Sequence, residues 1–158
     1  MILIVLIVFT GCGQNRITEK EEKKETVESE MNAEVKKTAQ TLRSVYMKEK
    51  SELNTLKVKR KIINCLEKKG YAAVDCDNQI DMVNREKVEE FCKAAEKEEQ
   101  AAVDIVVVFD EGEIIQYHLE SMNGKINVRL CQVKWKDNSP QANYYDEHEA
   151  YEWKYTEK

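Results

Sequence analysis

Two hairpin turns in the C-terminal half of the chain constrain the fold most strongly, because each turn sets the register of the strands that it joins. The pair Asn123-Gly124 has the composition of a two-residue hairpin turn. Earlier, residues 110–112 separate two segments in which apolar residues alternate with others. A three-residue loop with Gly112 in the left-handed conformation keeps both apolar sets on one face. The two turns predict a β-meander.

The predicted register also places three polar side chains in a row. On the face away from the apolar sets, Asp104, His118 and Arg129 should lie side by side across three strands. An acid, an imidazole and a guanidinium in a row could bind an anionic group or position a general base. The alternative is a ladder of cross-strand pairs on a solvated face, which antiparallel sheets often have. No nucleophile accompanies the row, so the sequence favours the ladder and assigns no catalytic residue.

The end of the chain predicts one more strand. Residues Lys136–Ala142, around the single proline, are predicted as a loop, and the last strand is predicted from about Glu149 to Tyr155. The aromatic residues of this region could form a platform for glycans, although aromatic residues alternating on a strand more often serve a core or an interface. These residues are Tyr144, Tyr145, Tyr151, Trp153 and Tyr155.

A long helix is predicted ahead of the strands. No glycine or proline interrupts residues 32–69, where apolar residues recur at intervals of three and four, and Gly70 follows as the expected stop. The apolar stripe lapses near residues 48–50. Because Glu49 and Arg60 break the heptads, a helix docked on a sheet is favoured over a coiled coil.

A short strand, Tyr71 to Asp75, and a second helix, about Arg85 to Glu98 with Asn84 as its N-cap, are predicted next. The inner face of that helix is predicted to comprise Val88, Phe91, Cys92 and Ala95. Together the elements predict an α+β domain, with a long N-terminal helix and a shorter second helix packed on one face of an antiparallel four-stranded β-meander.

The turn between the short strand and the second helix has the spacing of a calcium-binding loop. Its oxygen-bearing residues are Asp75, Asp77, Gln79, Asp81 and Glu86. Ile80 occupies the position where the calcium loop requires glycine, and a strand precedes the loop where a helix should. We therefore interpret the segment as an acidic strand-to-helix turn and predict no metal site and no cofactor.

The first residues resemble the lipobox of bacterial lipoproteins. Eight apolar residues, Ile2 to Phe9, lead into Thr10-Gly11-Cys12, and the run is too short to span a membrane. The pattern predicts a signal peptide at 1–11, lipid attachment at Cys12, a charged tether at 12–31 and a domain at 32–158. Glu–Lys pairs in the tether also allow a solvated extension of the following helix. No basic residue precedes the apolar run, which predicts that the leader is trimmed at its start.

The net charge and the cysteine content limit the classes of binding partner and the disulfide bonds that can be expected. The chain has 25 basic and 30 acidic residues, a net charge of −5, and no basic stripe, so nucleic acid is not an expected partner. The expected partner is the membrane, through lipid on Cys12, and the expected location is the outer face of the cell membrane. The other cysteines, which allow three disulfide pairings without a diagnostic spacing, are Cys65, Cys76, Cys92 and Cys131.

Two segments carry a family resemblance. The sequences GYAAVDCDNQIDMVNREKVEEFCKAAE (70–96) and EWKYTEK (152–158) resemble an uncharacterised lipoprotein family of anaerobic gut Firmicutes, a domain of unknown function. The resemblance runs from the leader to Lys158 and implies attachment to the cell envelope, without implying an activity. It also implies that the chain corresponds to the N-terminal portion of longer relatives, with a domain incomplete at its C-terminus.

Three functions are compatible with these features. The leading hypothesis is a non-enzymatic binding or interaction module anchored to the envelope. The alternatives are an enzyme that uses the exposed sheet face around Asp104, His118 and Arg129, and an inhibitor-like helix-on-sheet domain suggested by fold analogy alone.

Overall fold

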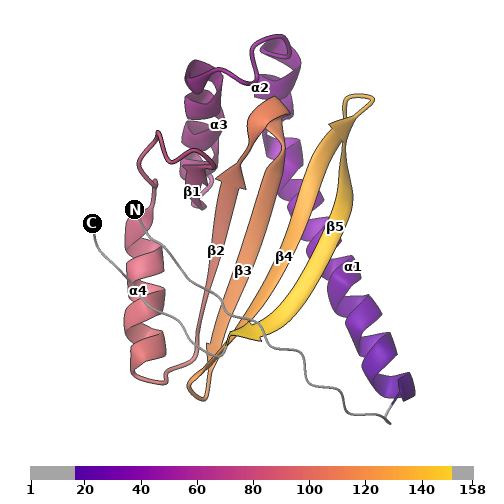
Figure 1. The fold of residues 1–158 in the computed structure, drawn as a ribbon, viewed down its shortest axis with the longest axis vertical. Coiled ribbons are helices and arrows are strands. Elements are labelled where there is room, and N and C mark those ends of the chain that lie inside the picture. Colours follow the sequence, from indigo (N-terminus) through magenta and orange to yellow (C-terminus); the bar gives the residue numbers. More distant parts are fainter. Residues whose placement is uncertain (1–16, 151–158) are drawn as a thin grey trace.

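The computed structural model describes residues 17–150, with side chains from Lys24 onward. This part of the chain contains four helices, a short 3₁₀ turn and five strands, whose arrangement is drawn in Figure 1. In chain order they are α1 (Ile17–Thr41), α2 (Arg43–Lys48), α3 (Leu56–Lys68), β1 (Ala72–Asp75), α4 (Arg85–Glu96), β2 (Ala101–Val108), η1 (Asp110–Gly112), β3 (Ile114–Met122), β4 (Lys125–Lys136) and β5 (Ser139–Ala150).

The strands form one sheet in the order β1-β2-β3-β4-β5. Strands β2, β3 and β4 follow the predicted antiparallel meander, and β5 continues it from Ser139 rather than from the predicted Glu149. Strand β1 pairs in parallel with β2 through a crossover that contains α4. The four-stranded prediction is therefore corrected to five strands. The short segment before α4 was predicted as a strand, but nothing local in the sequence indicated its parallel partner, because that partner lies beyond a helix.

Both predicted hairpin registers are confirmed. Val103 pairs with Leu119, and Leu119 in turn pairs with Val128. At the first turn Gly112 has φ +73°, the predicted left-handed conformation, and at the second Asn123 and Gly124 have φ 53° and 74°. The turn residues thus supply the backbone angles that these hairpins require.

The loop predicted at 136–142 is wrong. Asp137 and Asn138, with φ 51° and 61°, make a tight turn, and β5 begins directly afterwards. Asparagine and aspartate both tolerate this conformation, which allows a hairpin without glycine. Pro140 lies in β5, an outermost strand, where a missing N–H can be tolerated. Of the strand predicted from Glu149, only the first two residues are described, and they end β5.

The single helix predicted over 32–69 is also corrected. The structure divides it into α1, α2 and α3, and the interruption at 49–55 coincides with the lapse in the apolar stripe. Thr55 caps α3, its hydroxyl accepting from the Val58 N–H at 3.4 Å. Gly70, with φ +85°, follows the end of α3 as predicted. Residues 17–31 are helical and continue into the rest of α1, so this part of the predicted tether extends the helix.

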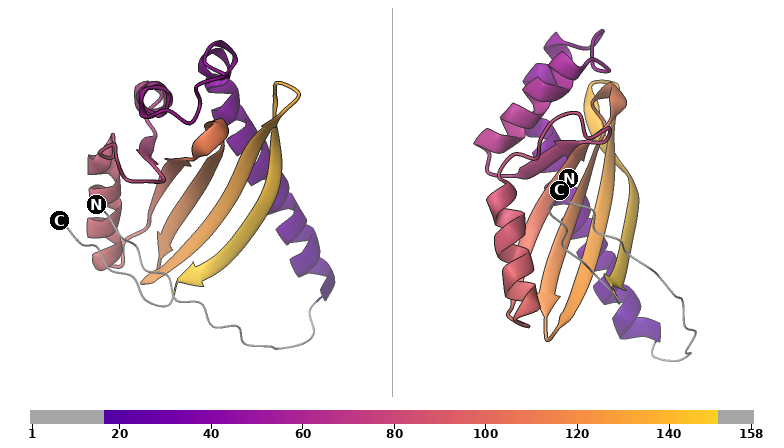
Figure 2. Two further views of the ribbon diagram at one scale, coloured as in Figure 1. Left: turned by 45° about the horizontal axis from the view of Figure 1, so that its top comes forward. Right: turned by 60° about the vertical axis from the view of Figure 1, so that its left-hand side comes forward.

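Helices cover both faces of the sheet, not one. Helices α1 and α3 pack on one face and α4 packs on the other, and Figure 2 shows α1 and α4 on opposite sides of the sheet. Val106 and Val108 of β2 pack with α1 and α3, whereas Val103 and Ile105 pack with α4. Because apolar residues occur at both parities of β2, the strand has two faces to bury. The predicted inner residues of α4 are all buried.

Asn84 precedes α4 as predicted but does not cap it. It has φ 48°, and no side-chain capping hydrogen bond is formed. Its amide instead donates to the carbonyl oxygens of Glu67 (3.1 Å) and Tyr71 (2.8 Å). The residue therefore connects the start of α4 to the turn between α3 and β1.

A buried lysine forms two ion pairs at the end of the sheet near η1. The ammonium of Lys59, on α3, lies 2.7 Å from Asp77 and 2.8 Å from Asp110. Burial alone would lower the pKa of Lys59, but these two hydrogen bonds outweigh it and raise the pKa above its ordinary value. The interaction joins α3, the loop after β1 and the β2–β3 turn.

Candidate functional site: a groove beside the open edge of β2

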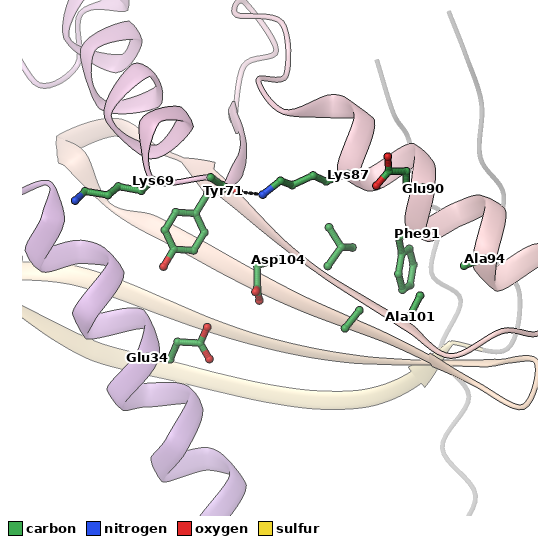
Figure 3. Close-up of a pocket in the computed structure, with 12 residues that line it drawn as sticks. Glu34, Lys69, Tyr71, Lys87, Glu90, Phe91, Ala94, Ala101 and Asp104 are labelled. Carbon is green, nitrogen blue, oxygen red and sulfur yellow. Dashed lines mark hydrogen bonds between the residues drawn. The ribbon is translucent and has the colours of Figure 1, made fainter.

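A groove of about 690 Å³ lies beside the first half of β2 (Figure 3). Strand β2 forms its floor. Helix α1 contributes one wall through Glu34, helix α4 contributes the other through Phe91 and Ala94, and the α3–β1 turn closes one end. Segments far apart in the sequence therefore meet at this groove.

The groove exists because β1 is shorter than β2. The first rung of their ladder pairs Ala72 with Ile105, and β1 does not reach Ala101–Asp104. Gly70 turns the chain toward α3 immediately before β1 begins. Within residues 17–150, no strand pairs with this part of β2 on the side that faces the groove.

The wall on the α1 side is polar and connected. The hydroxyl of Thr38 lies 2.8 Å from Oε1 of Gln116 and 3.0 Å from the hydroxyl of Tyr71. The Gln116 amide donates to Glu34 at 3.3 Å and to Asp104 at 3.4 Å. Thr38 and Gln116 are fully buried, so their hydrogen bonds offset the cost of placing polar groups in the interior.

Figure 3 shows how this network reaches the groove. Glu34 points from α1 toward β2, the Tyr71 ring lies above it, and the Asp104 carboxylate lies between them. All three residues line the groove. The buried pair Thr38–Gln116 therefore supports three polar groups that a ligand could contact.

The predicted polar row is present. Asp104 pairs with His118, and His118 pairs with Arg129, as the register required. The His118 Nδ1 lies 2.9 Å from Asp104 Oδ1, while Arg129 lies 3.5 Å from Glu120. The face is not the solvated one that was expected, because α1 covers part of it and these side chains are partly buried.

The wall on the α4 side combines charged residues, Lys87 and Glu90, with the apolar residues Phe91 and Ala94. Phe91 and Ala94 face the groove together with Val103 of β2. At the β1 end the ammonium of Lys87 donates to the carbonyl oxygen of Gly70, and Lys69 of the α3–β1 turn also lines the groove. The α1 side therefore presents carboxylates, whereas the α4 side presents hydrocarbon together with the charges of Lys87 and Glu90.

The acidic residues of the calcium-like loop have structural roles. Asp75 accepts from the backbone N–H groups of Gln79 (3.1 Å) and Ile80 (2.7 Å), so its carboxylate stabilises the turn. Asp77 binds Lys59. Among the described residues, no group of three or more His, Cys, Asp or Glu side chains is arranged to hold a metal. The four cysteines of the described chain are free thiols.

The two described members of the predicted aromatic platform differ in exposure. Tyr144 is exposed, whereas Tyr145 packs against the core on the α1 side. Burial, and then the neighbouring Glu147 carboxylate, raise the pKa of Tyr145 to about 12. The remaining members of the platform, Tyr151, Trp153 and Tyr155, lie outside the described residues, as does Cys12.

The polar row of Asp104, His118 and Arg129 could be predicted from the sequence, whereas the groove could not. The available signal was Gln116, which lies between Ile114 and His118 at the same parity of β3, where its side chain is fully buried. A buried amide requires partners, but nothing in the sequence indicated that α1 would supply Thr38 and Glu34. The shortness of β1, which opens the edge, was equally hidden.

The model of a family of unknown function (DUF6070) matches residues 28–158. The chain belongs to this family. The matched region begins within α1 and includes every residue that lines the groove. No curated protein and no solved structure matches the chain. No helix among residues 17–150 is long and apolar enough to cross a membrane.

Proposed function

We propose that the chain is a cell-envelope lipoprotein, held at the outer face of the membrane by lipid on Cys12, whose domain is a non-enzymatic binding module. The groove beside β2 is its ligand site. The observation that carries this proposal is a concave site in which a buried, hydrogen-bonded network holds Glu34, Tyr71 and Asp104 toward a shared space.

A binding role fits the site better than catalysis. Asp104 and His118 form a carboxylate–imidazole pair, which in hydrolases orients a general base. In the described chain, however, no serine, threonine or cysteine side chain hydrogen-bonds His118, so no nucleophile is in place for it to activate. Asp104 also accepts from Gln116, which adds it to the supporting network.

Metabolic labelling with a fatty acid tests the anchor. The full chain expressed in a lipoprotein-processing bacterium should incorporate label and remain with the membrane fraction. Cys12→Ala should lose both label and membrane association, while the control Cys65→Ala should keep both, because Cys65 lies in α3. Equal labelling of the two variants would contradict attachment at Cys12.

Site-specific photo-crosslinking in cells tests the groove independently. A photoreactive residue in place of Ala102, in the groove floor, should give a discrete adduct. The same residue in place of Arg60, which is exposed on α3, is the matched control. Adducts of equal yield at both sites, or none at Ala102, would contradict the groove as the ligand site.

A further inference from the structure

We propose that the ligand is an extended peptide that adds as a strand to residues Ala101–Asp104 of β2. Its side chains would alternate, with a lysine or arginine toward Glu34 and Asp104 and an apolar residue toward Phe91 and Ala94. This inference rests on the proposed function of the groove as a ligand site and names the chemical class of its occupant.

In the described part of the chain, the backbone of β2 presents unpaired hydrogen-bonding groups along its open edge. The Cys76 N–H donates to the Val108 carbonyl at 2.9 Å, so Val108 directs its backbone groups toward β1. Backbone groups alternate sides along a strand, so Val106, Asp104 and Ala102 direct theirs to the same edge. Because the ladder begins at Ala72 opposite Ile105, the Asp104 N–H and both groups of Ala102 lie beyond it.

These groups form a short template. Among the described residues, no backbone group pairs with the Asp104 N–H or with either group of Ala102 on this side. The four residues of the open segment extend over about 13 Å. A peptide strand matches such a row of alternating donors and acceptors, which is the basis of recognition by strand addition.

The two walls supply the side-chain pattern. Asp104 lies on the α1 side of the sheet near Glu34, whereas Val103 lies on the α4 side near Phe91. Successive side chains of an added strand would point alternately to these two sides. A basic residue would therefore meet the carboxylates of Glu34 and Asp104. The next residue would meet the hydrocarbon of Phe91 and Ala94, in a wall that also carries Lys87 and Glu90.

The opposite edge of the sheet shows what a protected edge looks like. Strand β5 is the outermost strand there in the described chain, and it carries Pro140, several acidic residues and an irregular register near Gln132 and Val133. Proline, charge and bulges are features that discourage strand pairing. In contrast, Ala101, Ala102 and Val103 are small and uncharged, so these three residues of the open segment lack that protection.

The test is a titration of the isotope-labelled full chain, followed by NMR, with the capped peptide acetyl-Val-Lys-Val-Lys-Val-amide. We expect saturable shifts of the Ala102 and Asp104 amides and slower hydrogen exchange at both. The charge-reversed peptide acetyl-Val-Glu-Val-Glu-Val-amide should bind at least about tenfold more weakly. Equal affinity for the two peptides would overturn the assigned side-chain pattern.

Backbone methylation separates strand addition from side-chain contact. Two versions of the Val-Lys peptide are N-methylated, each on one alternate set of amides. A paired strand directs only one set toward β2, so one version should lose binding and the other should keep it. Equal binding by both versions would overturn strand addition.

Variants of the chain test the assigned carboxylates. Glu34→Gln should weaken the Val-Lys peptide about two- to fivefold, as expected for a partly exposed ion pair. The control Glu25→Gln, at an exposed position of the same helix, should leave affinity unchanged. If no peptide shifts Ala102 or Asp104 while crosslinking at Ala102 persists, the peptide inference fails and the groove stands; if both fail, the proposed function fails too.

Discussion

Two neighbouring rows of side chains on one face of the sheet differ in their surroundings. In the first row, the covered row, Val106, Gln116 and Cys131 are each 0% exposed. Two residues further along each strand, the open row places the side chains of Asp104, His118 and Arg129 at 32%, 21% and 21% exposure. The two rows share their strands and their register.

The difference follows from what lies above and beside each row. Helix α1 covers the first row through Thr38, which bonds Gln116 at 2.8 Å, and Asn32, whose side-chain oxygen is 3.1 Å from the Cys131 thiol. Strand β1 pairs with β2 at Val106 but ends its ladder before Asp104. The cover of the sheet by α1 and the pairing of β2 with β1 therefore both stop between Val106 and Asp104, and the groove begins there.

Thiol accessibility should show the largest contrast between the rows. Cys131 is buried, and burial raises its pKa to about 11, so few thiolates form near pH 8. A thiol placed in the open row by Arg129→Cys should react with iodoacetamide at least about a hundredfold faster than Cys131 in the folded chain. Peptide mass mapping resolves the two sites, and comparable rates would show that the covered row is not closed.

Replacing the central residue of each row should affect stability differently. Gln116→Leu removes an amide that bonds Thr38 and should lower the free energy of unfolding by about 1–3 kcal/mol. The matched change His118→Leu, on the same strand, should cost less than about 1 kcal/mol because its partner Asp104 remains partly exposed. Urea denaturation measures both; a larger loss for His118→Leu would reverse the comparison.

Alkaline pH should gradually lower the free energy of unfolding, because it ionises Cys131 in the covered row. Burial raises the Cys131 pKa from 9.0 to about 11 in the folded chain, so between these values the unfolded chain ionises first. Stability should fall as pH rises from about 9 to about 11, by at most about 3 kcal/mol from this group. Cys131→Ala should lose less stability over the same interval, and an identical pH profile for the two chains would contradict this origin.

The sequence predicted the local parts of the fold. Residues with special backbone angles, Gly70, Gly112 and the Asn123-Gly124 pair, predicted one helix end and two turns correctly. From these turns and the apolar alternation followed the register that brings Asp104, His118 and Arg129 side by side. Such features are predictable because neighbouring residues alone determine them.

The errors concern contacts between distant segments or weak local signals. The Asp137-Asn138 turn lacks glycine, so its hairpin was read as a loop. Packing across the whole domain determines three other features. These are the parallel pairing of β1, the placement of α1 above Gln116, and the position along β2 at which the pairing and the cover by α1 both stop. Because the groove arises from those three features together, no single segment of the sequence predicted it.

Amide hydrogen exchange along β2 in the full chain distinguishes an open edge from a closed one. After correction for intrinsic rates, we expect the Ala102 and Asp104 amides to exchange at least about a hundredfold faster than those of Val106 and Val108, which face β1. Adding the Val-Lys peptide should slow the first pair alone. Equal protection of all four amides without peptide would show that the edge of β2 is already closed and that no strand can add there.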